Sequence, residues 1–483
     1  MPDLEEDSTD TTVIRNCDWI VAWDGDRHVY RRGGDIAFAG GRLLHVGRAY
    51  GGPAATVLDG RNRMVMPGLV DLHSHPSTEP AYRGIREEHG SRAMFMTGLY
   101  ERSCAFLSDA QGQLAAAEVA YCEVLLSGAT TLSDLSRPYP GWLDLMARSG
   151  LRGFLAPWFA SARWRMQSAS VLAFDWDEAA GEREFAQALD LIEAARAHPS
   201  GRLGGVVFPA QIETCTPALL RDANAAALER GLPITTHIAQ SVTEVLEIMA
   251  RHGVTPVQFA SDLGLLHPAM TLAHCIFIDD HSWLHLRSRR DLALVADSGA
   301  SVAHCPLPFA RYGAVLEDFG RYRRAGVNIG IGTDTTPQNM IEEMRWALTL
   351  CKTETGDVDG TGLADIFHAA TVGGARALLR DDIGRLAPGC RADLVLVDLQ
   401  QPWMAPARDP LRSLVFHAAD RAVRDVFVDG NRVVRDGRVL TLDHAGALDR
   451  LAEAQARMMG RVPQHDFLGR TADQIAPLTL PLA

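Results

Sequence analysis

The sequence predicts an α/β protein, a (β/α)₈ TIM barrel with a small β-sandwich formed from both chain ends. Short strand-like runs with Gly-rich turns occupy residues 13–66, and a matching set returns at 393–437. Between them, strand candidates alternate with helical stretches through eight units, as in a closed parallel barrel. A doubly wound open sheet is the alternative, and the absence of a Gly-rich nucleotide turn disfavours it.

The β-sandwich is predicted from residues 12–65 plus 385–440, after an acidic, disordered tail over residues 1–11. Neither set of strands is large enough to bury a good core alone, so we expect the two sets to pair. The strand runs are Trp19–Trp23, Asp35–Ala39, Arg42–Val46, Thr56–Leu58, Asp393–Leu399, Ala422–Val428 and a hairpin over Gly430–Gly437.

The barrel is predicted from residues 66–384, followed by a C-terminal helix and tail over 441–483. Its strands are Val65–Asp71, Ala129–Leu135, Arg152–Pro157, Gly204–Ile212, Pro233–Ala239, Thr271–Ile278, Ser301–Leu307 and Val327–Asp334. Its helices are Asp109–Ser127, Asp177–His198, Thr216–Arg230, Val242–His252, Asp280–Ser298, Leu316–Ala325, Asn339–Cys351 and Leu363–Leu379. The segment Pro140–Ser149 is too short to predict a helix.

Composition narrows the class of partner. The formal net charge of −13 argues against nucleic acid or an anionic membrane as a partner, and weakly favours neutral or cationic small molecules. The eight cysteines form no C-x-x-C pair, and neither a signal-like segment nor a run of 18 apolar residues is present. We therefore expect a cytoplasmic protein with reduced thiols.

The stretch Val65–His75 carries the first sign of chemistry. An apolar, strand-like run follows the turn at Pro67-Gly68 and ends in His73-x-His75. Residues two apart on a strand point to the same face, so both imidazoles can meet one metal ion at the strand's C-terminal end. Two buried structural histidines would give the same short pattern, so the later strands decide between the two interpretations.

Four later strands also end in residues that bind metals or move protons: His237 with Gln240, His274, His304 and Asp334. Three neutral imidazoles (His73, His75, His237) and the Asp334 carboxylate suit one divalent ion, Zn²⁺ or alternatively Fe²⁺, with a position left for water. Such an ion lowers the pKa of bound water to about 7, which makes a hydroxide nucleophile at neutral pH. Asp334 can accept the water's proton and His274 can stabilise the attacked group, while His304 lines the rim or is structural.

These residues carry a resemblance to the amidohydrolase superfamily. Val65–His75 resembles its P-G-[FL]-[IV]-D-x-H-x-H opening, and the later strand ends follow in the family's order. Gly384–Val397 is similar to the segment that re-enters the β-sandwich. The resemblance covers residues 12–440 and, through His304-Cys-Pro306 and Glu342–Arg345, points to the branch with triazine hydrolases and cytosine, guanine and methylthioadenosine deaminases. It implies His73, His75, His237 and Asp334 as ligands and His274 as the catalytic histidine.

Two departures from the family pattern affect the expected mechanism. Binuclear members bridge two metals with a carboxylated lysine on strand four, and the single lysine here, Lys352, lies beyond strand eight. The deaminases usually have Glu where this chain has Gln240, and an amide cannot shuttle a proton. The leaving group would then be protonated by Asp334 with His274 or by a loop carboxylate (Glu79, Glu87 or Glu88). Alternatively, the group leaves easily and needs no proton donor.

Specificity is expected from the loops at the barrel mouth. The loop after strand three contains Trp158 and Trp164, which favour a flat or apolar substrate, although the same aromatics could pack a lid or a dimer interface. Arg83, Arg86, Arg163 and Arg311 are candidates for binding a carboxylate. Cys275 and Cys305 lack a base for nucleophilic work and are expected to be buried fillers.

The sequence thus predicts a cytoplasmic, mononuclear metal-dependent amidohydrolase, a homodimer or higher oligomer, that cleaves a non-peptide C–N bond in a small, fairly apolar nitrogen compound. An amide, urea, carbamate or activated heterocycle would be the target. The alternative is a deaminase or dechlorinase of a purine-, pyrimidine- or triazine-like ring with a relocated proton shuttle. A more remote alternative is an inactive relative that binds or assembles. Gln240, Asp334 and His274 are the expected catalytic residues, and Arg83, Trp158, Trp164 and His304 the expected substrate contacts.

Overall fold

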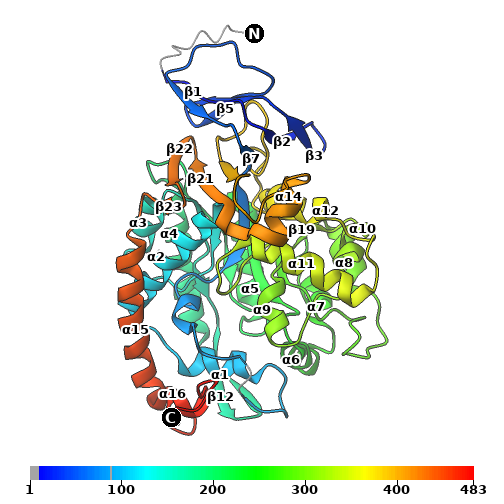
Figure 1. Cartoon of the computed structure of the whole chain (residues 1–483). Helices are drawn as coiled ribbons and strands as arrows, with labels where there is room; N and C mark the ends of the chain where they lie inside the picture. The colour runs from blue at the N-terminus through cyan, green and yellow to red at the C-terminus, as the bar shows by residue number, and fades with distance from the viewer. Residues whose placement is uncertain (1–9, 88–89, 483) are drawn as a thin grey trace.

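A computed structural model describes residues 10–87 and 90–482 as a barrel capped at one end by strands from both chain ends (Figure 1). The first part of the predicted tail, residues 1–9, lies outside these ranges, and strand β1 begins at Thr12. None of the helices in the described ranges is long and apolar enough to cross a membrane.

Eight positions around the barrel are filled by parallel strands. They are β8 (Leu69–Ser74), β9 (Ala129–Asp134), β10 (Arg152–Leu155), the short pair β14 (Gly204–Gly205) and β15 (Phe208–Pro209), β16 (Ile234–Ile238), β17 (Met270–His274), β18 (Ser301–His304) and β19 (Asn328–Ile331). Parallel bridges Val207–Ile234 and Gln211–His237 join the two halves, and the bridge Ser74–Asp334 closes the last strand onto the first. The predicted closed barrel is confirmed.

The sandwich strands form two sheets. Seven strands pair in the order β23-β22-β21-β20-β7-β2-β3, so β7 of the N-terminal part lies beside β20 of the C-terminal part. Their bounds are β2 (Trp19–Trp23), β3 (His28–Arg32), β7 (Arg63–Pro67), β20 (Leu394–Asp398), β21 (Val423–Val428), β22 (Asn431–Arg435) and β23 (Arg438–Val439). The second sheet holds β1 (Thr12–Arg15), β4 (Asp35–Ala39), β5 (Arg42–Gly47) and β6 (Thr56–Asp59).

The helices surround the barrel and extend over its mouth (Figure 1). They are α1 (Thr97–Ala105), α2 (Ala110–Leu126), α3 (Trp142–Ser149), α4 (Glu178–Arg196), α5 (Pro217–Arg230), α6 (Val242–His252), α7 (Pro256–Asp262), α8 (Asp291–Ser298), α9 (Pro306–Arg311), α10 (Phe319–Arg324), α11 (Met340–Thr355), α12 (Leu363–His368), α13 (Gly374–Ala377), α14 (Pro410–Ser413), α15 (His444–His465) and α16 (Ala472–Ile475). Short 3₁₀ or π turns occupy Glu79–Tyr82, Ala369–Gly373, Leu414–Ala418 and Ala419–Ala422.

Three local expectations differ from the structure. The segment Pro140–Ser149 does form a helix, α3, which begins and ends at glycines in left-handed conformation. The helix predicted over Asp280–Ser298 begins only at Asp291, because Asp291 is buried and accepts hydrogen bonds from Thr255 and Gln258. The aromatic loop after strand three folds into a hairpin, β12 (Ala162–Ser168) with β13 (Val171–Trp176), after a two-residue strand β11 (Trp158–Phe159).

The opening stretch Val65–His75 divides between the two parts of the molecule. Its first half, β7, pairs in the sandwich, and its second half, β8, enters the barrel. The break is at Gly68, where an added Cβ would lie 2.0 Å from Thr130 Oγ1, so no larger residue fits without a shift. One continuous segment therefore ties the sandwich directly to the first barrel strand.

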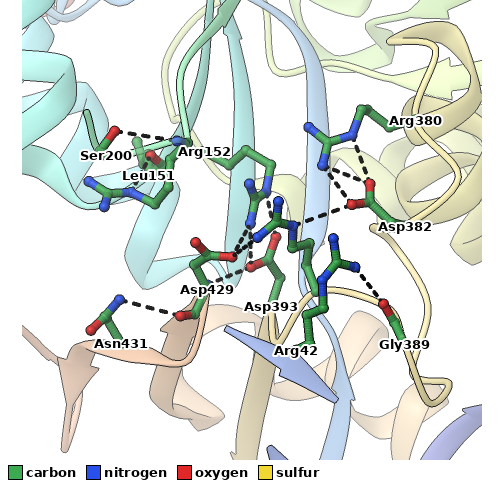
Figure 2. A network of polar contacts seen from close by, with 12 residues as sticks. Arg42, Leu151, Arg152, Ser200, Arg380, Asp382, Gly389, Asp393, Asp429 and Asn431 are labelled. Atoms are coloured by element: carbon green, nitrogen blue, oxygen red, sulfur yellow. Dashed lines mark hydrogen bonds and ion pairs between the residues drawn. The ribbon is translucent and has the colours of Figure 1, made fainter. Parts of the chain in front are cut away.

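A buried ion network fastens the same junction (Figure 2). Arg152, at the start of β10, has a fully buried side chain and donates to Asp393 Oδ2 at 2.8 Å and Oδ1 at 3.0 Å. It also donates to Asp429 Oδ1 at 3.1 Å, and Arg391 donates to the same oxygen at 3.0 Å. Because the partners come from the barrel and from the sandwich strands, the network holds the two parts in one register.

We expect Asp393→Asn to destabilise the protein by about 3–5 kcal/mol, because it leaves the buried Arg152 guanidinium without its main countercharge. Urea unfolding followed by circular dichroism measures this change. The matched control is Asp175→Asn, since Asp175 pairs with Arg165 through side chains that are about half exposed, 52% for Arg165 and 55% for Asp175. We expect little change there. Equal stability of the two variants would contradict this assignment.

Candidate functional site

Five side chains from four strand ends converge at the C-terminal mouth of the barrel. His73 and His75 lie at the end of β8, His237 on β16, His274 at the end of β17 and Asp334 just beyond β19. One ligand atom from each of His73, His237, His274 and Asp334 lies within 4.8 Å of the others. His75 joins them, with its Nε2 3.2 Å from His237 Nε2 and 3.3 Å from Asp334 Oδ1.

These spacings fit a single metal ion. Four ligands at about 2.0–2.1 Å from a tetrahedral zinc ion are separated from one another by about 3.3–3.4 Å. The distances from Asp334 Oδ1 to His73 Nε2 (3.4 Å) and to His75 Nε2 (3.3 Å), and that between His75 and His237, match this edge length. Within the described residues, neither ring nitrogen of the buried His73 has a hydrogen-bond partner. An ion would satisfy its Nε2.

Backbone carbonyls fix how two of the imidazoles point. His75 Nδ1 lies 2.7 Å from the carbonyl oxygen of Leu135, and His237 Nδ1 lies 2.6 Å from that of Ala210. A carbonyl oxygen can only accept, so each Nδ1 carries the proton and each Nε2 keeps a free lone pair. Both lone pairs face the centre of the cluster, and metal-binding histidines are commonly held in this way, with the other ring nitrogen donating to a carbonyl oxygen.

The protonation states also suit a metal. Burial lowers the pKa of His73, and burial together with the neighbouring imidazoles lowers the pKa of His237 well below its ordinary value. Burial also lowers the pKa of His274. Although burial alone would raise it, the imidazoles of His73 and His75 beside Oδ1 hold the pKa of Asp334 well below its usual range. At neutral pH the cluster therefore offers neutral imidazoles at His73, His237 and His274 and an ionised carboxylate, whereas the neighbouring Asp334 raises the pKa of His75 despite its burial. Metal binding would require the neutral form of His75 as well.

Backbone strain is concentrated at the same strand ends. Ala239, His274, Cys275 and Asp334 all have positive φ, at 52°, 76°, 47° and 57°. Non-glycine residues adopt this left-handed conformation at a cost, and it persists where the surrounding structure holds it. At Asp334 that hold is visible, because its N–H donates to the His73 carbonyl at 2.8 Å and its carbonyl accepts from the His75 N–H at 3.2 Å.

A cavity of about 390 Å³ opens directly onto the cluster. His75, His237, His274 and Asp334 form part of its lining. Its outer wall contains Trp158 from β11 and Trp164 from the hairpin, as the aromatic loop led us to expect. Trp164 Nε1 donates to the buried Glu213 Oε1 at 3.1 Å, which fixes the indole. The volume suits a molecule of one or two rings.

Gln240 also lines this cavity. Its backbone N–H donates to Glu244 Oε2 at 2.8 Å, and the Ala239 N–H donates to Oε1 of the same carboxylate at 2.6 Å. The Gln240 side chain is buried, and its Nε2 has no partner in the described part of the chain. The loop after β16 is therefore held by its backbone, and an amide donor is left for a bound molecule.

Two of the predicted substrate contacts lie elsewhere. His304 is buried beside Phe319, with ring centroids 5.9 Å apart, and is absent from the described lining of the cavity. Arg83 forms an ion pair with Glu123 and lines a neighbouring outer cavity. Their roles in binding substrate stay predictions. Cys275 and Cys305 are buried, and burial raises the pKa of each thiol.

The carboxylates named in the sequence analysis as alternative proton donors, Glu79, Glu87 and Glu88, differ in their position. Glu79 is buried and lines the cavity, with Arg102 Nη2 3.4 Å from its Oε1. Glu87 pairs with Arg311 at 3.1 Å, outside that lining, and Glu88 lies outside the described residues. Lys352, the single lysine of the chain, lies in the last turn of α11 and donates to the Val358 carbonyl. No lysine therefore lies beside the His/Asp cluster.

Sequence reasoning missed several cavity residues. Helix α1 supplies Leu99 and Arg102, the short helix α9 supplies Phe309, and Arg137 follows β9. The signal for Arg137 was available, since it comes two residues after a barrel strand. No pattern in the sequence indicated that α1 folds over the mouth.

Comparison with known proteins agrees with this arrangement. The model of the amidohydrolase family matches residues 64–433. A 5-methylthioadenosine/S-adenosylhomocysteine deaminase of Desulforudis audaxviator is 30% identical over 88% of this chain and 95% of its own. A 5'-deoxyadenosine deaminase of Methanosarcina mazei is 26% identical over 93% and 99%.

Solved structures with the same fold include a triazine hydrolase variant (TM-score 0.79, 22% identity, 93% of this chain and 99% of that one). An adenosine deaminase from Xanthomonas campestris with bound zinc has a TM-score of 0.78 at 22% identity, over 92% and 98%. The buried His/Asp cluster is compatible with metal-dependent hydrolysis of a C–N bond. With its family match extending well over half of its length, the chain belongs to the amidohydrolase family of hydrolases.

Proposed function

We propose that this protein hydrolyses a C–N bond that joins an amino or alkylamino group to a small, flat nitrogen heterocycle. One divalent ion, zinc in the first instance, would be held by His73, His75, His237 and Asp334. The observation that carries the proposal is the convergence of these side chains, at metal-ligand spacing, beside a cavity with aromatic walls. When bound, the ion supplies a Lewis acid that activates water near neutral pH.

The remaining work falls to residues of the chain. Asp334 is ionised and its Oδ1 faces both His73 and His75, so it can accept the proton that an attacking water loses. His274 is neutral and buried at the cavity wall, so it can hydrogen-bond the attacked carbon's substituent and stabilise the charge that develops there. The unpartnered Gln240 amide can hold a ring nitrogen or carbonyl in place.

The substrate class rests on two supports. Trp158 and Trp164 give the cavity flat walls that match a ring. The relatives that match most of the chain are named as deaminases of 5'-deoxyadenosine and of 5-methylthioadenosine/S-adenosylhomocysteine, all adenine compounds. A purine-, pyrimidine- or triazine-like ring is therefore the first choice.

Gln240 favours a second candidate, the hydrolysis of an acyclic amide, urea or carbamate. A glutamine amide cannot deliver a proton to a ring nitrogen, and such substrates have no ring nitrogen to protonate. Their leaving nitrogen can take the proton that Asp334 accepts from the attacking water, so that a neutral amine departs. Among the loop carboxylates named above, Glu79 is the one that lines the cavity, and it is already paired with Arg102.

Several finer points belong to the same proposal. We expect one metal ion per chain, because a lysine on strand four is lacking. A cytoplasmic location and a homodimeric or higher assembly stay predictions, as does the choice of zinc over iron.

We expect His73→Ala to lose its metal and its turnover together, because the fully buried His73 Nε2 faces Asp334 at the centre of the cluster. Metal content measured on the purified, folded variant should fall to a small fraction of one ion per chain. His304→Ala is the matched control, a buried histidine at the next strand end that lies apart from the cluster, and it should keep its metal. Retained metal and activity in His73→Ala would refute the proposal.

Asp334→Asn tests the role of Asp334 as proton acceptor independently of its role as a metal ligand. The amide keeps the shape and an oxygen ligand but cannot accept the proton, and a positioned general base contributes about 10²–10⁴-fold to a rate. We expect folded protein that still binds metal and turns over about 10³-fold more slowly. Wild-type turnover at equal metal loading would exclude Asp334 as the base.

A substrate panel distinguishes the two candidate reactions. Amino- and alkylamino-triazines and adenosine would be assayed beside aryl ureas and carbamates, with release of ammonia or amine as the readout. For the ring reaction we expect Gln240→Glu to raise turnover of the poorly activated amino rings by about tenfold or more, because a carboxyl group can protonate the ring. Turnover confined to ureas or carbamates would instead establish the second candidate.

A further inference from the structure

Three arginines line the cavity beside the His/Asp cluster, and their interaction partners differ. Arg102 faces Glu79 at 3.4 Å, and Arg163 pairs with Glu184. Arg137 forms no hydrogen bond or ion pair with any residue in the ranges 10–87 and 90–482. Among these three arginines, Arg137 is therefore the one without an ion pair of its own, although the Glu184 carboxylate that pairs with Arg163 also acts on it at longer range.

The position of Arg137 relates it to the reaction centre. It follows β9 two residues after Leu135, whose carbonyl oxygen accepts the hydrogen bond from His75 Nδ1. The two-residue step from Leu135 to Arg137 spans at most about 7 Å, so the backbone of Arg137 lies close to the His/Asp cluster. Its side chain is exposed, and it also lines an adjoining outer groove with Trp164 and Met166. The guanidinium group thus stands where the cavity meets solvent.

Trp158 holds this guanidinium group in place. The Cζ atoms of Arg137 and Arg163 each lie 4.1 Å from the centroid of the Trp158 ring. Surrounding protein atoms, and then the neighbouring Arg163, lower the pKa of Arg137 to about 10, so it remains protonated at neutral pH. Stacking on an indole fixes the plane of a guanidinium group and leaves its N–H edge free to bind an anion.

From this unpaired, stacked cation we propose that Arg137 binds a carboxylate carried by the substrate, at the end of the molecule remote from the bond that is cleaved. This deepens the proposed function, on which it rests. The planar fork of a guanidinium group matches the two oxygens of a carboxylate, and Trp158 beside it would contact the ring. The substrate class becomes a nitrogen heterocycle with an acidic side arm.

The arginines singled out in the sequence are less suited to this task. Arg83, Arg163 and Arg311 each have a carboxylate partner of their own, and Arg86 also has an interaction within the chain. A substrate anion would have to compete with those acids. Arg137 has no hydrogen-bonded partner in the described structure and feels only the longer-range attraction of Glu184, so its N–H groups are available for a charge-assisted hydrogen bond to a ligand.

The test is equilibrium binding of benzoate and of benzamide, its uncharged counterpart, to the metal-loaded protein by calorimetry. We expect the wild type to bind benzoate at least about tenfold more tightly than benzamide, and Arg137→Gln to lose that preference, since hydrogen bonds to charged groups contribute about 1.5–3 kcal/mol. Arg137→Lys should keep part of it. Arg165→Gln, which removes an exposed arginine paired with Asp175, is the matched control and should behave as wild type.

Two outcomes would overturn the inference. One is a wild-type protein without preference for benzoate. The other is unchanged benzoate affinity in Arg137→Gln, which would place the anion on the metal ion instead. Because the measurement needs no turnover, either result leaves C–N hydrolysis itself untouched, whereas an inactive enzyme with intact benzoate binding would count against the proposed function alone.

Discussion

The seam between the first and last barrel strands is the constraint on which the site depends. At that seam Ser74 and Asp334 form a parallel bridge, and the backbone of Asp334 bonds to His73 and His75 on either side. The three side chains cannot change their spacing unless the barrel opens. Hydrogen bonds from His75 and His237 to carbonyls of neighbouring strands extend the same control around the mouth. The ligand geometry is thus a property of the β ladder rather than of mobile loops.

The junction with the sandwich supports this seam from the opposite end. The chain passes from β7 to β8 through Gly68, whose N–H donates to the Asp393 carbonyl at 3.0 Å. Asp393 also binds the buried Arg152 at the start of β10. The strand that carries His73 and His75 is therefore anchored at both ends. We infer that the sandwich, which contributes no residue to the described cavity lining, still fixes the register of the site.

The sequence allowed the barrel and the cluster to be predicted because both rest on short-range patterns. A period of two along a strand is enough to pair His73 with His75, and the C-terminal ends of parallel strands must meet at one mouth. The hairpin at 162–176 and the helices α1 and α9 could not be predicted in the same way, because their conformation depends on packing across the mouth. Buried partners of Asp291 also fix the start of α8 at that residue, later than predicted, which no local propensity encodes.

The arginines show that the pairing of charges could not be predicted from the sequence either. On the sequence alone Arg83 is a candidate for binding an anion and Arg137 is missed, and only three-dimensional pairing separates the two. The net charge of −13 by itself opposes an acidic substrate. At physiological ionic strength, however, exposed charges are screened beyond about 8 Å, so the whole-protein charge has little influence at the end of a cavity. What a ligand meets there is the local wall, where Arg137 on Trp158 has no ion pair of its own. Local pairing, rather than composition, then decides which sign of charge the site accepts.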